Sequence, residues 1–160
     1  QFGVEPDVMV LAKGLGNGFP IGALLAREEI AKCFIPGTHG ATFGGNPLAA
    51  AAALATCETL TGGVIDHGAR MGALLRSRLD EMASRFPFIK EVRGIGLHLA
   101  AETDIDCKPV LEACIARGLL VNVIQGKILR FIPPLVVTGD EIAEGSATLE
   151  AALELAGGAG

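Results

Sequence analysis

The spacing of apolar residues divides the first half of the chain into short strands followed by long helices. Continuous apolar runs at residues 7–12 and 21–26 predict two short strands, and the first has the character of a strand buried on both faces. Residues 48–60 form a smooth, alanine-rich stretch that predicts a helix packed closely against a neighbour. Residues 64–86 place apolar side chains on one stripe at helical spacing, which predicts a long amphipathic helix.

Beyond residue 86 the pattern becomes that of a compact unit of strands and helices. Residues 89–93 and 96–102 predict two strands joined at Gly94. Residues 107–117 predict an amphipathic helix, and Gly118 is a natural stop for it because glycine adopts the left-handed conformation at helix ends.

The last part of the chain predicts a second pair of strands and a final helix. The strands fall at residues 119–124 and 128–132, with residues 125–127 as their turn. Thr138 and Glu141 have the spacing of a capping box, which starts a helix. Both halves of the chain therefore mix helices and strands, and the predicted fold class is α/β.

Two glycine-rich loops interrupt the first half of the chain. Residues 14–20 form a turn-forming stretch that we expect neither to continue a strand nor to start a helix. Residues 36–47 are dense in glycine and threonine, and Pro47 suits the first turn of the helix that follows. Gly62 and Gly63 predict a break before the long helix.

Composition marks a folded chain and argues against two classes of partner. Of 160 residues, 50% are hydrophobic and 19% are charged, which is too apolar for a disordered chain. The net charge is −5 and the basic residues form no stripe, so nucleic acid and anionic membranes are poor partners. We find no uninterrupted apolar run long enough to span a bilayer, and we expect a cytoplasmic protein without a membrane partner.

The cysteines do not have the spacing of a metal site or of a disulfide framework. They lie in apolar segments without a CxxC pair, and we expect them to be small buried side chains in a reducing compartment. The four are Cys33, Cys57, Cys107 and Cys114. We therefore predict no metal site.

Lys13 is the first candidate for chemistry, because it directly follows a predicted buried strand and precedes a glycine-rich loop. A desolvated lysine amine has a lowered pKa and can form a Schiff base, while the glycines let the backbone approach a flat ligand. A lysine whose head reaches solvent at the end of a strand explains the same pattern. The loop has neither the P-loop pattern nor the dinucleotide fingerprint, so nucleotide binding is a weak interpretation.

Two further positions are candidates for binding anionic groups. The loop from Thr38 to Pro47 places hydroxyl and backbone N–H groups just before a helix, which suits a phosphate or a helix entry with local caps. Arg130 alternates with Leu129 and Phe131, so it either points to the wet face of a strand or offers a bidentate fork to a carboxylate.

Four blocks of sequence together resemble the class III, fold type I aminotransferases that depend on pyridoxal 5′-phosphate (PLP). The first two are LAKGLGNGFPIGA, which contains Lys13, and GTHGATFGGNPLAAAAA, which contains Thr42. The other two are VRGIGL and LRFIPPL, the latter containing Arg130. The blocks occur in the family's order, and the likeness extends from Gln1 to about Leu155.

The resemblance implies a role for each candidate residue. Lys13 would hold the PLP cofactor as a Schiff base and then act as the base in a proton transfer. Thr42 would bind the phosphate of the cofactor in the neighbouring subunit of a homodimer. Arg130 would pair with the α-carboxylate of a substrate such as glutamate, which implies an amino donor and a 2-oxo acid as small-molecule partners.

Within the family, the segment THGATFGGNPLA is most similar to the sequence of the acetylornithine aminotransferases. That subgroup implies conversion of N-acetylornithine and 2-oxoglutarate to N-acetylglutamate semialdehyde and glutamate in arginine biosynthesis. The ornithine, succinylornithine and 4-aminobutyrate aminotransferases share most of these residues and stay open as alternatives.

The resemblance covers only the C-terminal part of family members. It implies that residues 1–60 belong to the large PLP-binding domain, residues 61–86 to a bridging helix and residues 87–160 to the small C-terminal α/β domain. The family's aspartate for the pyridine nitrogen would lie before Gln1, so we expect the isolated chain to be incomplete and inactive. We also expect it to expose apolar strand residues and to associate with copies or with the missing half. A non-catalytic α/β fragment or assembly module is the alternative.

Overall fold

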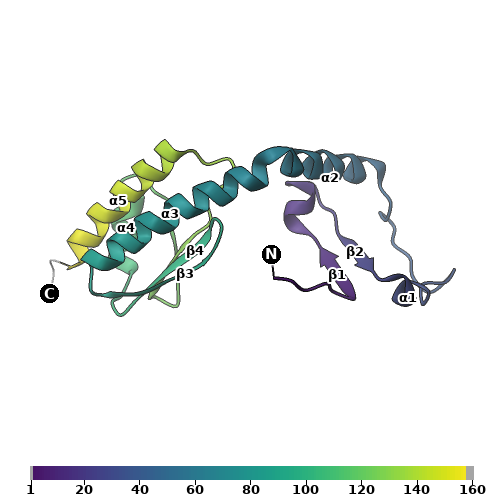
Figure 1. The fold of residues 1–160 in the computed structure, drawn as a ribbon, viewed down its shortest axis with the longest axis horizontal. Coiled ribbons are helices and arrows are strands. Elements are labelled where there is room, and N and C mark those ends of the chain that lie inside the picture. Colours follow the sequence, from purple (N-terminus) through teal and green to yellow (C-terminus); the bar gives the residue numbers. More distant parts are fainter. Residues whose placement is uncertain (1, 158–160) are drawn as a thin grey trace. The chain divides into compact units, whose positions relative to one another are not determined.

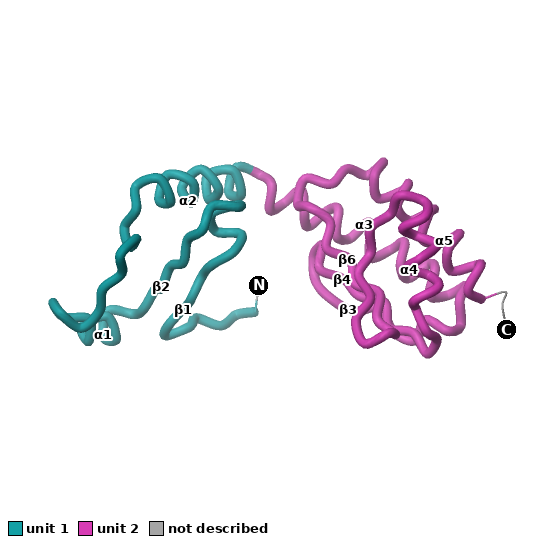
Figure 2. Tube along the Cα trace, turned by 180° about the vertical axis from the view of Figure 1, so that it is seen from behind, with its two compact units in different colours: residues 1–62 teal, residues 63–160 magenta. Residues whose placement is uncertain are grey.

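The computed structural model describes residues 2–157 and divides into two compact units, residues 1–62 (unit 1) and residues 63–160 (unit 2) (Figure 2). Both units contain helices and strands, as Figure 1 shows, so the predicted α/β class is confirmed. Only Gly157 of the terminal glycines lies within the described residues.

Unit 1 is a two-stranded ribbon with helical segments around it. Strands β1 (Val8–Leu11) and β2 (Ala23–Ala26) pair antiparallel, with Val8 opposite Ala26. Between them the chain makes a 3₁₀ turn, Lys13–Gly16, which contradicts the expectation that this loop starts no helix. The turn forms because Leu15 N–H donates to the Ala12 carbonyl at 3.1 Å and Asn17 N–H to the Gly14 carbonyl at 3.2 Å.

The strands of unit 1 are exposed, so the prediction of a strand buried on both faces is wrong for this chain. All four residues of β1 are exposed, with Val10 at 72%, and in β2 Leu24 is 53% exposed. A two-stranded ribbon leaves its faces open unless other elements cover them, and none of the described residues does so. The expectation of exposed apolar strand residues is confirmed.

Two helices complete unit 1. The short α1 (Glu28–Ala31) follows β2, and α2 (Pro47–Thr59) occupies the predicted alanine-rich stretch with Pro47 in its first turn. The Oδ1 of Asn46 caps α2 by accepting from Leu48 N–H at 2.9 Å and from Ala49 N–H at 3.2 Å. Within α2 only Ala49 is buried, although the turn at Lys13–Gly16 packs against this helix.

The predicted break at the glycine pair is a kink within a continuous helical stretch. A π-helical turn, Leu60–Val64, contains Gly63 with a φ of +119° and leads into α3 (Ile65–Arg85). The whole stretch Pro47–Arg85 is long and apolar enough to cross a membrane by length and composition alone. The expectation concerned an uninterrupted apolar run, and this stretch is not one, because Glu58 and Asp66 interrupt it.

Unit 2 is a four-stranded antiparallel sheet packed against three helices. Its strands are β3 (Ile89–Ile95), β4 (His98–Thr103), β5 (Asn122–Ile124) and β6 (Ile128–Phe131), in the order β3-β4-β6-β5. The other two helices are α4 (Lys108–Ala116) and α5 (Gly139–Gly157). Gly94 does not join the first two strands as predicted, because β3 continues through it and the chain turns at residues 96–97.

The core of unit 2 lies between the sheet and the helices. From α3 it takes Leu75, Leu79 and Met82, which confirms the predicted apolar stripe. Cys107 and Cys114 are fully buried, and burial raises the pKa of both thiols. The expectation of burial fails for the two cysteines of unit 1, Cys33 and Cys57, which are exposed.

Gly72 of α3 makes the closest contact between this helix and the sheet. A Cβ atom at this position would lie 2.4 Å from the backbone carbonyl carbon of Gly96, in the turn between β3 and β4. No side chain fits at that distance, so the helix approaches the hairpin only because residue 72 is a glycine. The contact fixes α3 against the turn.

We expect Gly72→Ala to destabilise the chain by about 1–3 kcal/mol, because the added methyl group must push the helix from the hairpin. Gly145→Ala in α5 is the matched control, since its new Cβ would lie 3.6 Å from Leu119 Cδ1, an ordinary contact. The control should stabilise by up to about 1 kcal/mol through helix propensity. Thermal unfolding followed by circular dichroism measures both, and equal midpoints would contradict the close packing.

The predicted capping box is present at the start of α5. The N–H and the hydroxyl of Thr138 both donate to Glu141 Oε2 at 2.8 Å, and Glu141 N–H donates to Thr138 Oγ1 at 3.2 Å. The bond from the Thr138 backbone N–H, followed by that from its hydroxyl, lowers the pKa of Glu141 from its usual 4.5. The cap therefore depends on the ionised carboxylate.

We expect the stability conferred by Glu141 to be present above pH 4.5 and to be lost as the pH falls through the lower pKa of the folded state. Glu141→Ala should therefore unfold at a lower temperature than the parent chain at pH 7, and the difference should shrink at pH 3. Thermal midpoints at the two pH values measure this effect. A difference that stays constant would show that protonation does not matter to the cap.

Candidate active site

Lys13 lies at the point where β1 ends and the 3₁₀ turn begins. Its φ is +52°, in the left-handed region that side chains other than glycine rarely adopt. Strained backbone of this kind is concentrated at functional sites, because the surrounding structure must hold it in place. The side chain is exposed, so the described residues do not provide the burial that the desolvated-amine interpretation requires.

The glycines that follow Lys13 allow the loop to fold tightly. Gly16 is buried, and a Cβ atom there would lie 2.8 Å from Ile21 Cγ2. Gly18 has a φ of +107°, a conformation that favours glycine. Gly16 therefore permits a close contact with Ile21, while the space beside Gly14 and Gly18 is open within this chain, as the approach of a flat ligand would require.

A hollow of about 940 Å³ in unit 1 joins this loop to the loop that contains Thr42. Its lining comes from residues 19–22 on one side and from residues 41–46 and the first turn of α2 on the other. Thr42 lines the hollow and Lys13 does not. The structure therefore brings the two glycine-rich loops together, with Lys13 at the start of the first.

Thr42 retains a free hydroxyl in a turn just before α2. It is exposed, and among the described residues its side chain accepts and donates no hydrogen bond. Asn46 occupies the N–H groups of Leu48 and Ala49, so these two amides are not available to an anion. The phosphate interpretation of this loop therefore rests on the Thr42 hydroxyl and the turn that carries it.

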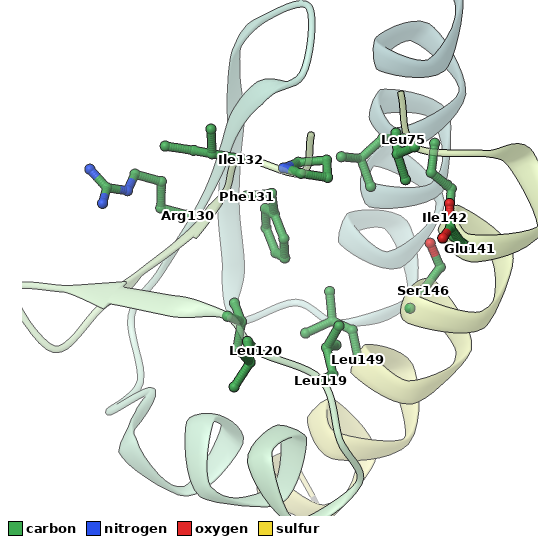
Figure 3. Close-up of a pocket in the computed structure, with 14 residues that line it drawn as sticks. Leu75, Leu119, Leu120, Arg130, Phe131, Ile132, Glu141, Ile142, Ser146 and Leu149 are labelled. Carbon is green, nitrogen blue, oxygen red and sulfur yellow. The ribbon is translucent and has the colours of Figure 1, made fainter. Parts of the chain in front are cut away.

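Arg130 lies in the middle of β6, opposite Ala100 of β4 and Asn122 of β5. Its Nε is buried and has no hydrogen-bond partner, and within residues 2–157 the guanidinium forms no ion pair. Arg130 is one of the residues that line a small pocket of about 170 Å³, together with Leu119 and Leu149, and Figure 3 shows its guanidinium extending away from these two leucines. Arg130 thus lies on the open face of the sheet and still has its fork free for a carboxylate.

The three candidate residues fall in different units. Lys13 and Thr42 belong to unit 1, on the two loops that share the hollow, and Arg130 belongs to unit 2. In the described part of the chain, no group of three or more histidine, cysteine or acidic side chains is arranged to hold a metal ion.

Sequence reasoning missed two groups of polar residues. Asn46 is the cap of α2, which the Asn-Pro pair before an alanine-rich run could have indicated. Arg93 bonds to Glu102 and Glu91 on the open face of the unit 2 sheet. The sequence gives no direct signal for that cluster, because it depends on which strands pair and in which register.

Comparison with known proteins identifies relatives along nearly the whole chain. The sequence model of the family described as "Aminotransferase class-III" matches residues 1–153. The acetylornithine aminotransferase of Methanothermobacter thermautotrophicus is 44% identical over 142 residues, covering 88% of this chain and 36% of that protein. The acetylornithine aminotransferase of Bacillus subtilis is 42% identical over 154 residues, covering 96% of this chain and 40% of that protein.

Solved structures agree with the sequence relatives. The ornithine aminotransferase of Toxoplasma gondii superposes with a TM-score of 0.88 at 37% identity, covering 96% of this chain and 38% of that one. The acetylornithine aminotransferase of Elizabethkingia anophelis gives 0.86 at 31% identity, covering 95% and 42%. A second structure of the Toxoplasma enzyme is described as having partial occupancy of PLP at the active site. The chain thus spans about two fifths of the length of the proteins it matches.

Proposed function

Since this chain belongs to the class-III aminotransferases, we propose that it forms part of an enzyme that uses PLP to move an amino group from an amino donor to a 2-oxo acid. The observation that carries the proposal is Lys13, held at a left-handed φ of +52° at the end of a strand and followed by a tightly folded glycine loop. Lys13 does not line the hollow between the two glycine-rich loops, but it begins the first of these loops, and its backbone is held in one conformation.

The proposed reaction is that of an acetylornithine aminotransferase, with N-acetylornithine as amino donor and 2-oxoglutarate as acceptor, in arginine biosynthesis. The relatives that are 42–44% identical over most of this chain support that choice. Ornithine is the second candidate donor, because the Toxoplasma ornithine aminotransferase matches the fold with a TM-score of 0.88. Succinylornithine and 4-aminobutyrate are weaker candidate donors, because only the shared sequence blocks support them.

The residues of this chain fit the proposed cofactor. PLP supplies an electron sink when bound, and the chain supplies an amine, a hydroxyl and a carboxylate-binding fork. The amine of Lys13 would attach the cofactor and then move a proton at its Nζ. The free hydroxyl of Thr42 would bind the phosphate group, across the interface of a homodimer. The guanidinium group of Arg130 would bind the α-carboxylate of the substrate and so orient the substrate.

The rest of the whole protein would complete the fold around unit 1. We assign residues 1–60 to the large PLP-binding domain, residues 61–86 to a bridging helix and residues 87–160 to the small C-terminal domain. The exposed apolar faces of β1, β2 and α2 would then be covered by protein, not by lipid, in a cytoplasmic dimer. The isolated chain would be inactive because its described residues leave Lys13 exposed.

We expect borohydride reduction of the whole protein with PLP to fix one cofactor on the peptide that contains Lys13, because the amine of Lys13 forms the bond that borohydride reduces. Peptide mapping by mass spectrometry measures the label. Lys13→Ala should lose the label, whereas Lys32→Ala, at another exposed lysine of unit 1, should keep it. The proposed function fails if Lys13→Ala still carries a stoichiometric adduct.

We expect Arg130→Lys in the whole protein to raise the KM for glutamate by about 10- to 100-fold, the equivalent of losing a hydrogen bond to a charged group. An ammonium cannot reproduce the two parallel bonds of a guanidinium. Arg117→Lys is the control, since Arg117 is exposed on unit 2 and, among the described residues, its guanidinium donates only to the Ala113 carbonyl at 3.1 Å. Steady-state kinetics measure both variants, and an unchanged KM for Arg130→Lys would remove the carboxylate role.

A further inference from the structure

Two overlapping turns connect Thr42 to the start of α2. In the first turn, Gly44 N–H donates to the Ala41 carbonyl at 3.3 Å, and Thr42 lies between these two residues. In the second turn, Asn46 N–H donates to the Phe43 carbonyl at 3.2 Å. The second turn begins inside the first and ends at the helix. The position of Thr42 therefore depends on how Asn46 is held.

Asn46 is held at this junction by the first turn of the helix. Its Oδ1 accepts from Leu48 N–H at 2.9 Å and from Ala49 N–H at 3.2 Å. Its backbone carbonyl accepts from Ala50 N–H at 3.0 Å. Side chain and backbone of Asn46 are thus both bonded to α2, and the loop that contains Thr42 is fixed to the helix at this residue.

The side chains of Asn46 and Thr42 line the same hollow. Both belong to the wall of the cavity of about 940 Å³ in unit 1, and they are the two polar side chains in the part of that wall that the structure describes. The rest of this lining consists of glycine, proline, alanine and larger apolar residues. The first turn of α2 contains no acidic residue. A charge placed at position 46 would therefore enter a wall that is otherwise uncharged, four residues from the Thr42 hydroxyl.

The amide of Asn46 is one of several side chains that would cap α2 well. Asparagine, aspartate and serine cap helices about equally, and a negative charge near a helix N-terminus adds stability. At the start of α4 a carboxylate does accept such a bond, from Lys108 N–H to Asp106 Oδ1 at 3.0 Å. Stability alone would thus favour aspartate at position 46 as much as asparagine. A phosphate group in the hollow removes that equivalence, because a carboxylate in the same wall would repel it.

We propose that Asn46 is a positioning residue for the cofactor, which holds the turn of Thr42 on α2 and does so without a negative charge that would repel the phosphate group of PLP. The proposal rests on the phosphate role of Thr42 in the proposed function. Two requirements meet at position 46: a fixed turn and an uncharged wall. Asparagine meets both, whereas aspartate would meet only the first and alanine only the second.

Three substitutions in the whole protein separate the two requirements. Asn46→Asp keeps the cap and adds the charge, so we expect the Kd for PLP to rise about tenfold while the thermal midpoint of the cofactor-free protein does not fall. Asn46→Ser keeps a neutral cap and should stay near the parent in both measurements. Asn46→Ala loses the cap, so the midpoint should fall and the Kd for PLP should rise about fivefold as the Thr42 hydroxyl loses its place. Absorbance titration of the cofactor-free protein measures Kd.

One ligand and one variant serve as matched controls. Pyridoxal lacks the phosphate group, so its Kd should not change in the variants at position 46. Asp106→Ala removes the bond at the start of α4, and it should lower the thermal midpoint without changing the ratio of the Kd for PLP to the Kd for pyridoxal.

An unchanged Kd for PLP in Asn46→Asp would overturn the proposal. So would an equal rise in the Kd values for PLP and pyridoxal, because either result leaves the cap with a structural role only. A lower midpoint in Asn46→Ala with the parent's Kd for PLP would likewise show that the cap does not position the turn. Failure of the proposed function is separate, since Lys13→Ala would then keep its adduct whichever residue is at position 46.

Discussion

Unit 2 depends on the alternation of side chains along β4, which separates the core from the charged face of the sheet. Leu99 and Ala101 point to the helices and are 2% exposed each, while Ala100 and Glu102 lie on the other face. The pairing of β4 with β3 and β6 extends this alternation across the sheet. A slip of one residue would bring charged side chains into the core, so burial of a few apolar residues fixes where every charge lies.

Unit 1 contains the candidate lysine but has no comparable core. Its ribbon and α2 leave apolar side chains in water, and a two-stranded ribbon alone is marginally stable. Local bonds in the turn Lys13–Gly16 and the contact with α2 hold the loop in shape. The described residues thus hold the lysine loop in shape but leave its amine exposed.

The sequence predicts most of the elements because their signals are local. The stripe of α3, the capping box of Thr138 and Glu141 and the glycine that ends α4 all depend on residues within a few positions of one another. The burial of β1 was mispredicted for a physical reason: a continuous apolar run leads to burial only where other elements cover the strand, and a two-stranded ribbon leaves both faces open. The left-handed φ of Lys13 had no signal, since lysine does not favour that conformation.

Local sequence signals predict even less about the candidate site. Lys13, Thr42 and Arg130 are found from sequence blocks, but a block does not show whether a side chain is free. Two carboxylates lie on the face that carries Arg130, and either arginine next to Glu102 could be neutralised by it. An arginine already paired with a neighbour binds a substrate carboxylate only by breaking that pair, so affinity depends on the difference between two ion pairs. The register of three strands decides which ion pair is the stronger. The same sequence motif can therefore carry an arginine whose guanidinium is either available or already paired.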